Sequence, residues 1–189
     1  MANQDSAFGL RAIGKIGQNR DAQGLSEYSI AASATAIYQG DPVKAINTGT
    51  IGVAAAGDVL LGSLNGIFYT DPSTQKPTWA NHLAASNAAT DIVGYVSDDP
   101  YERFEIQSNN AGASAQTDVF MNYDIAYAAG GSPNFVSKVE LDDSSVVSTT
   151  AQLRIIGVSK DPDNSELASA NTNFVVEIVE HFYKQAAGI

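Results

Sequence analysis

The chain contains no cysteine, and this absence removes several chemistries at once. Disulfide bonds, iron–sulfur clusters, thiolate zinc sites and cysteine nucleophiles all require a thiol. A small secreted domain without disulfides needs another source of stability, such as oligomerisation. The composition therefore leaves the compartment open and favours synthesis inside a cell.

Charge is also scarce, and most of it is negative. Charged residues make up 16% of the 189 residues, and the formal net charge is −11 at pH 7. Neutralisation of phosphates by Lys and Arg supplies much of the affinity of nucleic-acid-binding proteins, and anionic membrane surfaces attract basic segments. We therefore expect no nucleic-acid partner and no membrane partner.

Long apolar runs are missing as well. No segment approaches the ~20 apolar residues that a membrane-spanning helix needs. The opening MANQDSAFGLRAIGKIGQ lacks the unbroken apolar stretch of roughly 7–15 residues found in a secretory signal. Arg11 and Lys15 interrupt it, together with glycines. We expect this segment not to be a targeting signal.

Residues 1–24 are expected to form an extended docking arm. Glycines break any helix there, and the first 20 residues carry a net charge of +2 against −13 for the rest of the chain. A basic arm on an acidic body can fold back on its own chain or reach an acidic neighbour. The side chains expected to dock on a partner are Phe8, Leu10, Arg11, Ile13, Lys15, Ile16 and Arg20.

Residues 25–189 are expected to form one all-β body, a sandwich or barrel of short antiparallel strands with little helix. Short apolar runs alternate with glycine-rich and Asp-Pro turns throughout this range. The regular spacing of these turns has two interpretations, a degenerate structural repeat or strands that simply end in Asp-Pro turns. The Asp-Pro pairs are Asp41-Pro42, Asp71-Pro72, Asp99-Pro100 and Asp161-Pro162.

Several local patterns make more specific predictions. Asn65-Gly66 is a strong hairpin signal, and residues 77–91 are one of the few helix candidates. Residues 91–109 predict a strand, a turn and a second strand. Residues 151–164 and 172–184 predict a terminal strand pair, and the second strand is apolar on both faces, as in the middle of a sheet.

The search for catalytic and metal-binding patterns yields no site. His82 and His181 have no metal-binding spacing, and we expect a surface residue and a hydrogen-bonded structural residue respectively. Glu102 and Glu105 are three apart and point to opposite faces of a strand, so solvated charges explain them better than a glycosidase pair. Residues 161–166 are expected to form a loop with Asx turns and not a calcium site. The sequence thus predicts no cofactor, no metal and no enzyme activity.

Four stretches resemble the head decoration (cement) proteins of tailed bacteriophages. They are SAFGLRAIG, SEYSIAASATAIYQGDPV, DDPYERFEIQ and AQLRIIGVSKDPDNSELASANTNFVVEIVEHFYK, and their order along the chain carries the resemblance. The segment 108–135 departs from the more regular glycine-rich segment of that family.

This resemblance implies a β-sheet virion protein on the capsid surface that is made in the host cytoplasm. It implies a trimer that clamps adjacent major capsid proteins, with the major capsid protein and other copies of the chain as partners. An alternative function is a head-fibre or tail-associated module that binds host glycans through Tyr69, Trp79, Tyr95 and Tyr101. A third class, a wall or polysaccharide hydrolase, has no support in the sequence.

Overall fold

The computed structural model describes residues 3–16, 24–109, 114–186 and 188–189. These residues form short strands and three single-turn 3-10 helices, which confirms the expected all-β fold with little helix. The strands are β1 (Arg11–Lys15), β2 (Ser26–Ser29), β3 (Ile37–Tyr38), β4 (Pro42–Ile46), β5 (Thr50–Val53), β6 (Gly62–Thr70), β7 (Pro77–Ala80), β8 (His82–Leu83), β9 (Val93–Ser97), β10 (Glu102–Gln107), β11 (Asn122–Tyr123), β12 (Ile125–Ala126), β13 (Glu140–Leu141), β14 (Leu153–Val158) and β15 (Asn173–Ile178). The 3-10 helices are η1 (Gln116–Asp118), η2 (Asp143–Ser145) and η3 (Phe182–Lys184).

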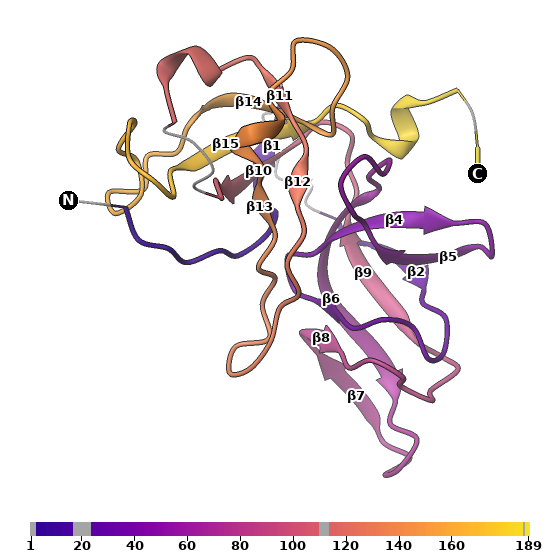
Figure 1. Ribbon diagram of the computed structural model, residues 1–189. Helices are drawn as coiled ribbons and strands as arrows, with labels where there is room; N and C mark the ends of the chain where they lie inside the picture. Colours follow the sequence, from indigo (N-terminus) through magenta and orange to yellow (C-terminus); the bar gives the residue numbers. More distant parts are fainter. Residues whose placement is uncertain (1–2, 17–23, 110–113, 187) are drawn as a thin grey trace.

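The first large sheet has five antiparallel strands in the order β1-β10-β15-β14-β11 (Figure 1). The expected terminal pair is present as β14 and β15, and β15 lies in the middle of the sheet. Phe174, Val176 and Ile178 alternate along β15 and bury one face of the strand, and Val175 and Glu177 on the other face are half-buried. The N-terminal arm supplies β1, which is an edge strand of this sheet.

The second large sheet has the order β2-β9-β6-β4-β5, and β7 pairs with β6 as a sixth strand. The nine-residue strand β6 is its longest, and it contacts β4, β7 and β9 through antiparallel ladders. Two small two-stranded sheets, β3-β8 and β12-β13, complete the strand pairing.

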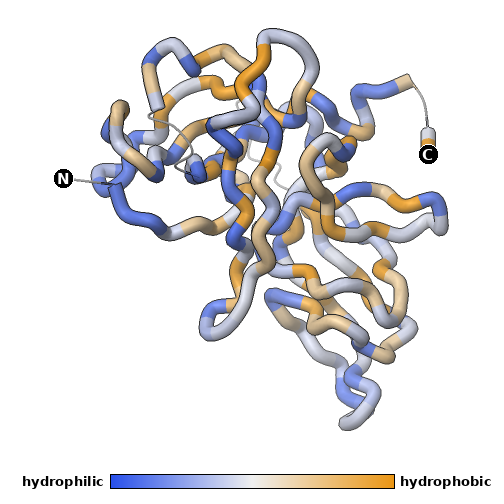
Figure 2. The backbone as a smooth tube through the Cα atoms, viewed as in Figure 1, coloured by the Kyte–Doolittle hydropathy of each residue, from blue (hydrophilic) through white to orange (hydrophobic). Residues whose placement is uncertain are grey.

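Each large sheet has its own apolar core, and orange segments appear in both halves of the molecule in Figure 2. The first core includes Phe104, Phe174 and Val176 of the five-stranded sheet. The second includes Val43 and Ile67 of the six-stranded sheet. Burying apolar side chains stabilises each half. The chain segments that join the two halves determine whether the halves unfold together.

At least three segments of the described chain join the two sheets. The turn at residues 98–101 leads directly from β9 to β10. Leu60, just before β6, exchanges two backbone hydrogen bonds with the segment that follows β15, from its own N–H to Glu180 (2.9 Å) and from Phe182 to its carbonyl (2.8 Å). The arm makes the third connection, because Leu10 belongs to the first core and donates its N–H to the carbonyl of Gly40 (2.8 Å).

Two local predictions are wrong. Residues 77–91 form β7, β8 and turns instead of a helix. Pro77 begins an edge strand, where its missing N–H costs no ladder bond, and Trp79 pairs with Phe68. Asn65 and Gly66 do not form a hairpin turn, because they lie within β6 at a register shift that adds one residue to the ladder with β9.

The prediction of a strand, a turn and a strand over residues 91–109 is confirmed, but β9 and β10 enter different sheets. The turn residues Asp99 and Asp161 accept hydrogen bonds from the backbone two residues ahead, as Asx turns do. Asp71 makes the same bond to the N–H of Ser73 (2.8 Å). Asp41 differs, since its carboxylate accepts from Tyr38, three residues earlier.

Candidate functional site

The basic charge of the arm was compatible with folding back on its own chain or with reaching an acidic neighbour. In the structure the arm folds back on its own chain. Leu10 is 1% exposed and sits in the core of the five-stranded sheet. Its N–H donates to Gly40, and its carbonyl accepts from the hydroxyl of Ser63 (2.6 Å). Backbone and side chain of Leu10 are therefore both fixed by the body.

A reciprocal glycine contact lets the arm pass this close to the body. A Cβ at Gly9 would lie 2.2 Å from the carbonyl oxygen of Gly40, and a Cβ at Gly40 would lie 2.5 Å from that of Phe8. Both glycines have positive φ angles, +75° and +86°. The two backbones can cross here only because neither residue carries a side chain.

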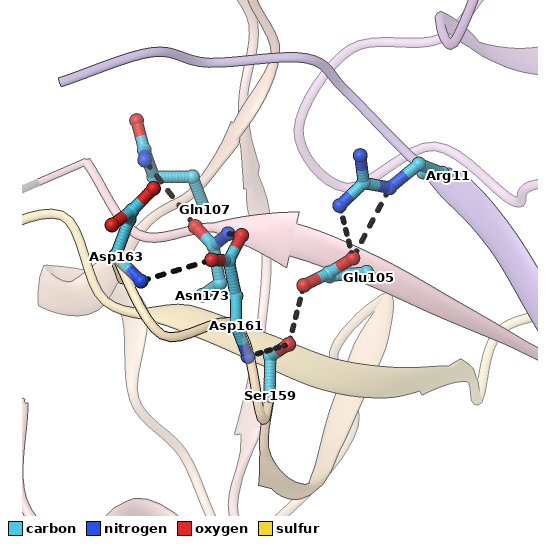
Figure 3. Close-up of polar contacts among 7 residues, drawn as sticks. All are labelled: Arg11, Glu105, Gln107, Ser159, Asp161, Asp163 and Asn173. Atoms are coloured by element: carbon cyan, nitrogen blue, oxygen red, sulfur yellow. Dashed lines mark hydrogen bonds and ion pairs between the residues drawn. The ribbon is translucent and has the colours of Figure 1, made fainter. Parts of the chain in front are cut away.

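Two basic groups of the arm, Arg11 and Lys15, bind carboxylates of the same chain, and Figure 3 shows the contact of Arg11 with Glu105. Arg11 donates to the carboxylate of Glu105 from Nε (3.1 Å) and Nη2, and the hydroxyl of Ser159 donates to the other oxygen of Glu105. Lys15 binds Asp99 at 2.6 Å, and this hydrogen bond raises the pKa of Lys15 and lowers that of Asp99. These two positive charges are neutralised within the chain.

The remaining arm residues have different environments. The guanidinium of Arg11 lies 4.4 Å from the centre of the Phe8 ring, a cation–π contact. Ile16 is half-buried and donates its N–H to the carbonyl of Tyr101 (3.0 Å). Ile13 is 46% exposed. Arg20 lies outside the described residues.

The carboxylates Glu102 and Glu105 are buried, so the expectation that they are solvated is wrong. They lie on β10 opposite Lys15 and Arg11 respectively, which places a basic side chain of the arm beside each one. The sequence alone gave no sign of this pairing, because the arm and β10 are about 90 residues apart. Burial raises the pKa of Glu102, and the charge of Lys15 acts against that increase.

The loop at residues 161–166 contains the expected Asx turn and is held by its own chain. Figure 3 shows Asp161 between the N–H of Asp163 (3.0 Å) and the side-chain amide of Asn173 (3.4 Å). Gln107 in turn donates to Asn173 (3.3 Å). Within the described ranges, no group of three or more His, Asp or Glu side chains is arranged to hold a metal ion.

The two histidines occupy structural positions. His181 is fully buried, and its Nδ1 accepts a hydrogen bond from the N–H of Tyr183 (3.1 Å). His82 lies on β8 and not on a helix, and its ring stacks on Phe135 at 4.1 Å between centroids. Tyr38 stacks against the same histidine ring at 6.0 Å. Neither histidine lies beside a nucleophile in a triad-like arrangement that the structure describes.

Exposed aromatic rings gather on one face of the six-stranded sheet, and we call Phe68, Trp79 and Tyr95 the aromatic face. Trp79 is 58% exposed and Phe68 is 38% exposed. The rings of Trp79 and Tyr95 are 4.8 Å apart at an angle of 52°. Of the four aromatic residues proposed for glycan binding, Trp79 and Tyr95 are brought together.

The other two aromatic candidates lie elsewhere. Tyr69 packs against the core of the six-stranded sheet, on the opposite face from Phe68. Tyr101 is exposed in the turn before β10, where the ammonium of Lys184 lies 5.5 Å from its ring centre. Phe68 was missed from sequence, although its position one residue from Tyr69 on a strand predicts that only one of the two faces the core.

An open cleft of about 410 Å³ lies between the arm and the start of β6. Phe8, Leu10 and Leu25 provide apolar lining, and Gln39 and Asn65 contribute amides. Arg11 is the one charged residue among its described lining residues. An apolar cleft with a few polar groups is the usual form of a small-ligand site.

No family model, curated protein or solved structure matches the chain. In the part of the chain that the structure describes, no helix has the length and apolar character of a membrane span. Three surfaces of the fold can carry a function. They are the edge at β1, the aromatic face, and the cleft between the arm and the start of β6.

Proposed function

We propose that the chain is a non-enzymatic structural protein of a tailed-phage virion. In this proposal it decorates the capsid surface as a trimer and stabilises it by clamping adjacent major capsid proteins. The order of the four resembling stretches supports the family. One structural observation supports the docking role: the N-terminal segment forms an edge strand, β1, that exposes an isoleucine.

An edge strand offers backbone N–H and C=O groups to a further strand. Adding a strand from a neighbouring protein to such an edge gives main-chain hydrogen bonds without strict side-chain recognition. A Cβ built at Gly14 has no atom within 4 Å, so one face of β1 is open at this position. Ile13, 46% exposed, supplies an apolar anchor at the same place.

The placement of the charges changes how the arm would dock. Because Arg11 and Lys15 bind Glu105 and Asp99 of their own chain, they contribute little net charge to a partner. Docking through β1 then rests on backbone hydrogen bonds and burial of Ile13. Binding of this kind depends only weakly on salt concentration, unlike binding through surface charges.

Binding to stripped phage heads tests the proposal. The wild-type chain should bind heads of its own phage at 50 and 300 mM salt alike, and sedimentation should give three times the chain mass of 19.8 kDa. Ile13→Lys should bind at least tenfold more weakly, since a lysine on an edge blocks strand addition. Val146→Lys, at a similarly exposed apolar residue near η2, is the matched control and should bind like the wild type.

Two results would contradict the proposal. Wild-type chain that does not bind the heads would remove the capsid role. Equal binding by Ile13→Lys and wild type, with both proteins folded, would show that β1 is not the docking edge.

A further inference from the structure

The aromatic face and the cleft lie on the same side of the six-stranded sheet. Cross-strand partners point to the same face, as do residues two apart on one strand. Phe68 is opposite Trp79, Gly66 is opposite Tyr95, and Ser63 is opposite Ser97. Ser97 lines the cleft and Tyr95 belongs to the aromatic face, about 7 Å apart along β9.

The indole of Trp79 lies against the backbone of β6 at Gly66. A Cβ at Gly66 would be 2.5 Å from Cζ2 of the indole, 3.1 Å from Cε2 and 3.2 Å from Cη2. The Cζ2 edge of the six-membered ring therefore lies over Gly66, and Trp79 remains 58% exposed. Tyr95 supports one side of the indole, so the ring is held in place before any ligand arrives.

The polar groups around this surface are largely neutral. The amides of Gln39 and Asn65 both line the cleft and contact each other, with Nε2 donating to Oδ1 at 3.3 Å. Arg11 is directed to Glu105 of its own chain. At the margin of the aromatic face, Glu27 lies opposite Tyr95 and places one exposed carboxylate there.

The geometry points to a binding site for a neutral oligosaccharide that spans the aromatic face and the cleft. One face of a pyranose ring carries C–H groups, which the negative face of an indole attracts. A ring stacked on Trp79 would place a neighbouring sugar toward Asn65 and Gln39. The amides can donate to and accept from sugar hydroxyls, and the carboxylate of Glu27 can accept from them, so no charged ligand is required.

Charge disfavours other ligands for this surface. A nucleic acid would meet a chain with a net charge of −11. An anionic glycan would meet the exposed carboxylate of Glu27, and Arg11, the one charged residue among the described residues that line the cleft, is already paired with Glu105. A protein partner remains the competing class, and the experiment below distinguishes it.

Trp79 is the one tryptophan of the chain, so its fluorescence reports directly on the site. The purified chain is titrated with a dextran, a mannan, a xylan and a β-1,3-glucan. At least one should shift the emission and reduce quenching by acrylamide. Electrophoresis in gels that contain the same polysaccharide should retard the wild-type chain.

Variants locate the site. Trp79→Ala should abolish the retardation, Trp79→Phe should restore part of it, and Asn65→Ala should weaken apparent affinity at least threefold. Tyr101→Ala is the matched control, since it removes an exposed aromatic ring outside this surface and should be retarded like the wild type. Thermal unfolding of each variant checks that the fold is intact.

The inference is overturned if none of the four polysaccharides affects Trp79 fluorescence or mobility, or if Trp79→Ala and Tyr101→Ala bind equally. If Trp79→Ala instead loses head binding while no polysaccharide binds, the face is a protein-docking surface and the inference is wrong. The Ile13 experiment addresses a different sheet edge, so either proposal can fail while the other stands.

Discussion

His181 illustrates how one buried side chain can hold a junction between two sheets. It is 0% exposed, and it pairs with Leu60 in an isolated parallel bridge just before β6. Its Nδ1 accepts from the N–H of Tyr183 and so caps η3. Protonation at Nδ1 would remove this acceptor, so the junction requires the neutral imidazole.

We predict that this residue makes stability pH-dependent. Burial first, and then the charge of Lys184, lower the pKa of His181 to about 4, against the opposing influence of Asp98 and Asp99. Between the unfolded value near 6.5 and the folded value near 4, the unfolded chain binds more protons. The contribution of His181 to the free energy of unfolding is complete above pH 6.5. It falls by about 3 kcal/mol as the pH drops to 4. Urea unfolding at pH 7, 5.5 and 4 measures the change.

The control is His181→Gln, which cannot titrate. Its stability should be lower at pH 7 and should depend less on pH over this window. Burial raises the pKa of Asp41 to about 6 and that of Glu140 to about 7, and both groups favour the folded state as the pH falls. They are present in both proteins, so the difference between wild type and variant isolates His181, and parallel pH profiles would refute the prediction.

At the residue scale, the sequence predicted hydrogen bonds between residues that are neighbours in the chain. It did not predict contacts between residues far apart in the chain. The Asx turns at Asp71, Asp99 and Asp161 follow from neighbours two residues away. The burial of Glu105 could not be foreseen, because it depends on Arg11 and on a strand pairing set by the whole sheet.

At the element scale, the arm is part of the body and not an appendage. β1 pairs with β10, and Leu10 fills part of the first core. Gly9 and Gly40 allow the crossing that brings Leu10 there. Removing the whole arm would therefore disturb the fold as well as any docking, and point variants are the better test of its function.

We predict that stability depends on the apolar anchor of the arm more than on its charge. Leu10→Ala should lower the free energy of unfolding by about 2–5 kcal/mol, since it leaves a cavity in a closed core. Arg11→Ala should cost less, about 1–2 kcal/mol, because it leaves the buried carboxylate of Glu105 without its cation while Ser159 still donates to it. Urea unfolding of both variants at pH 7 measures the two values. Equal losses, or a larger loss for Arg11→Ala, would contradict this ranking.

The missed elements share one cause. The hairpin expected at Asn65-Gly66 and the helix expected at 77–91 were both inferred from local preference. In the fold, β6 pairs with β9 on one side and β7 on the other, and these ladders outweigh a local turn or helix signal. Long-range pairing of this kind is invisible in a short sequence window.

At the scale of the whole molecule, at least three connections of the described chain join the two apolar cores, including the arm, the 98–101 turn and the segment after β15. We predict that the two halves unfold together. Trp79 fluorescence follows the six-stranded sheet, and hydrogen exchange of β15 amides follows the five-stranded sheet. The urea midpoints reported by these two probes should coincide within error, as in a two-state transition. Two separated midpoints would show that the connections do not couple the halves.

The sequence by itself determined the fold class, the terminal strand pair and the Asx turns at Asp71, Asp99 and Asp161, because alternation of apolar residues and turn chemistry act over a few residues. It also indicated two of the three rings of the aromatic face, Trp79 and Tyr95. Only the tertiary structure decided that the arm returns to its own body, that Glu102 and Glu105 are buried, and that Gly66 lies under an indole. These features depend on contacts between segments far apart in the chain, and their energies exist only once both sheets have formed.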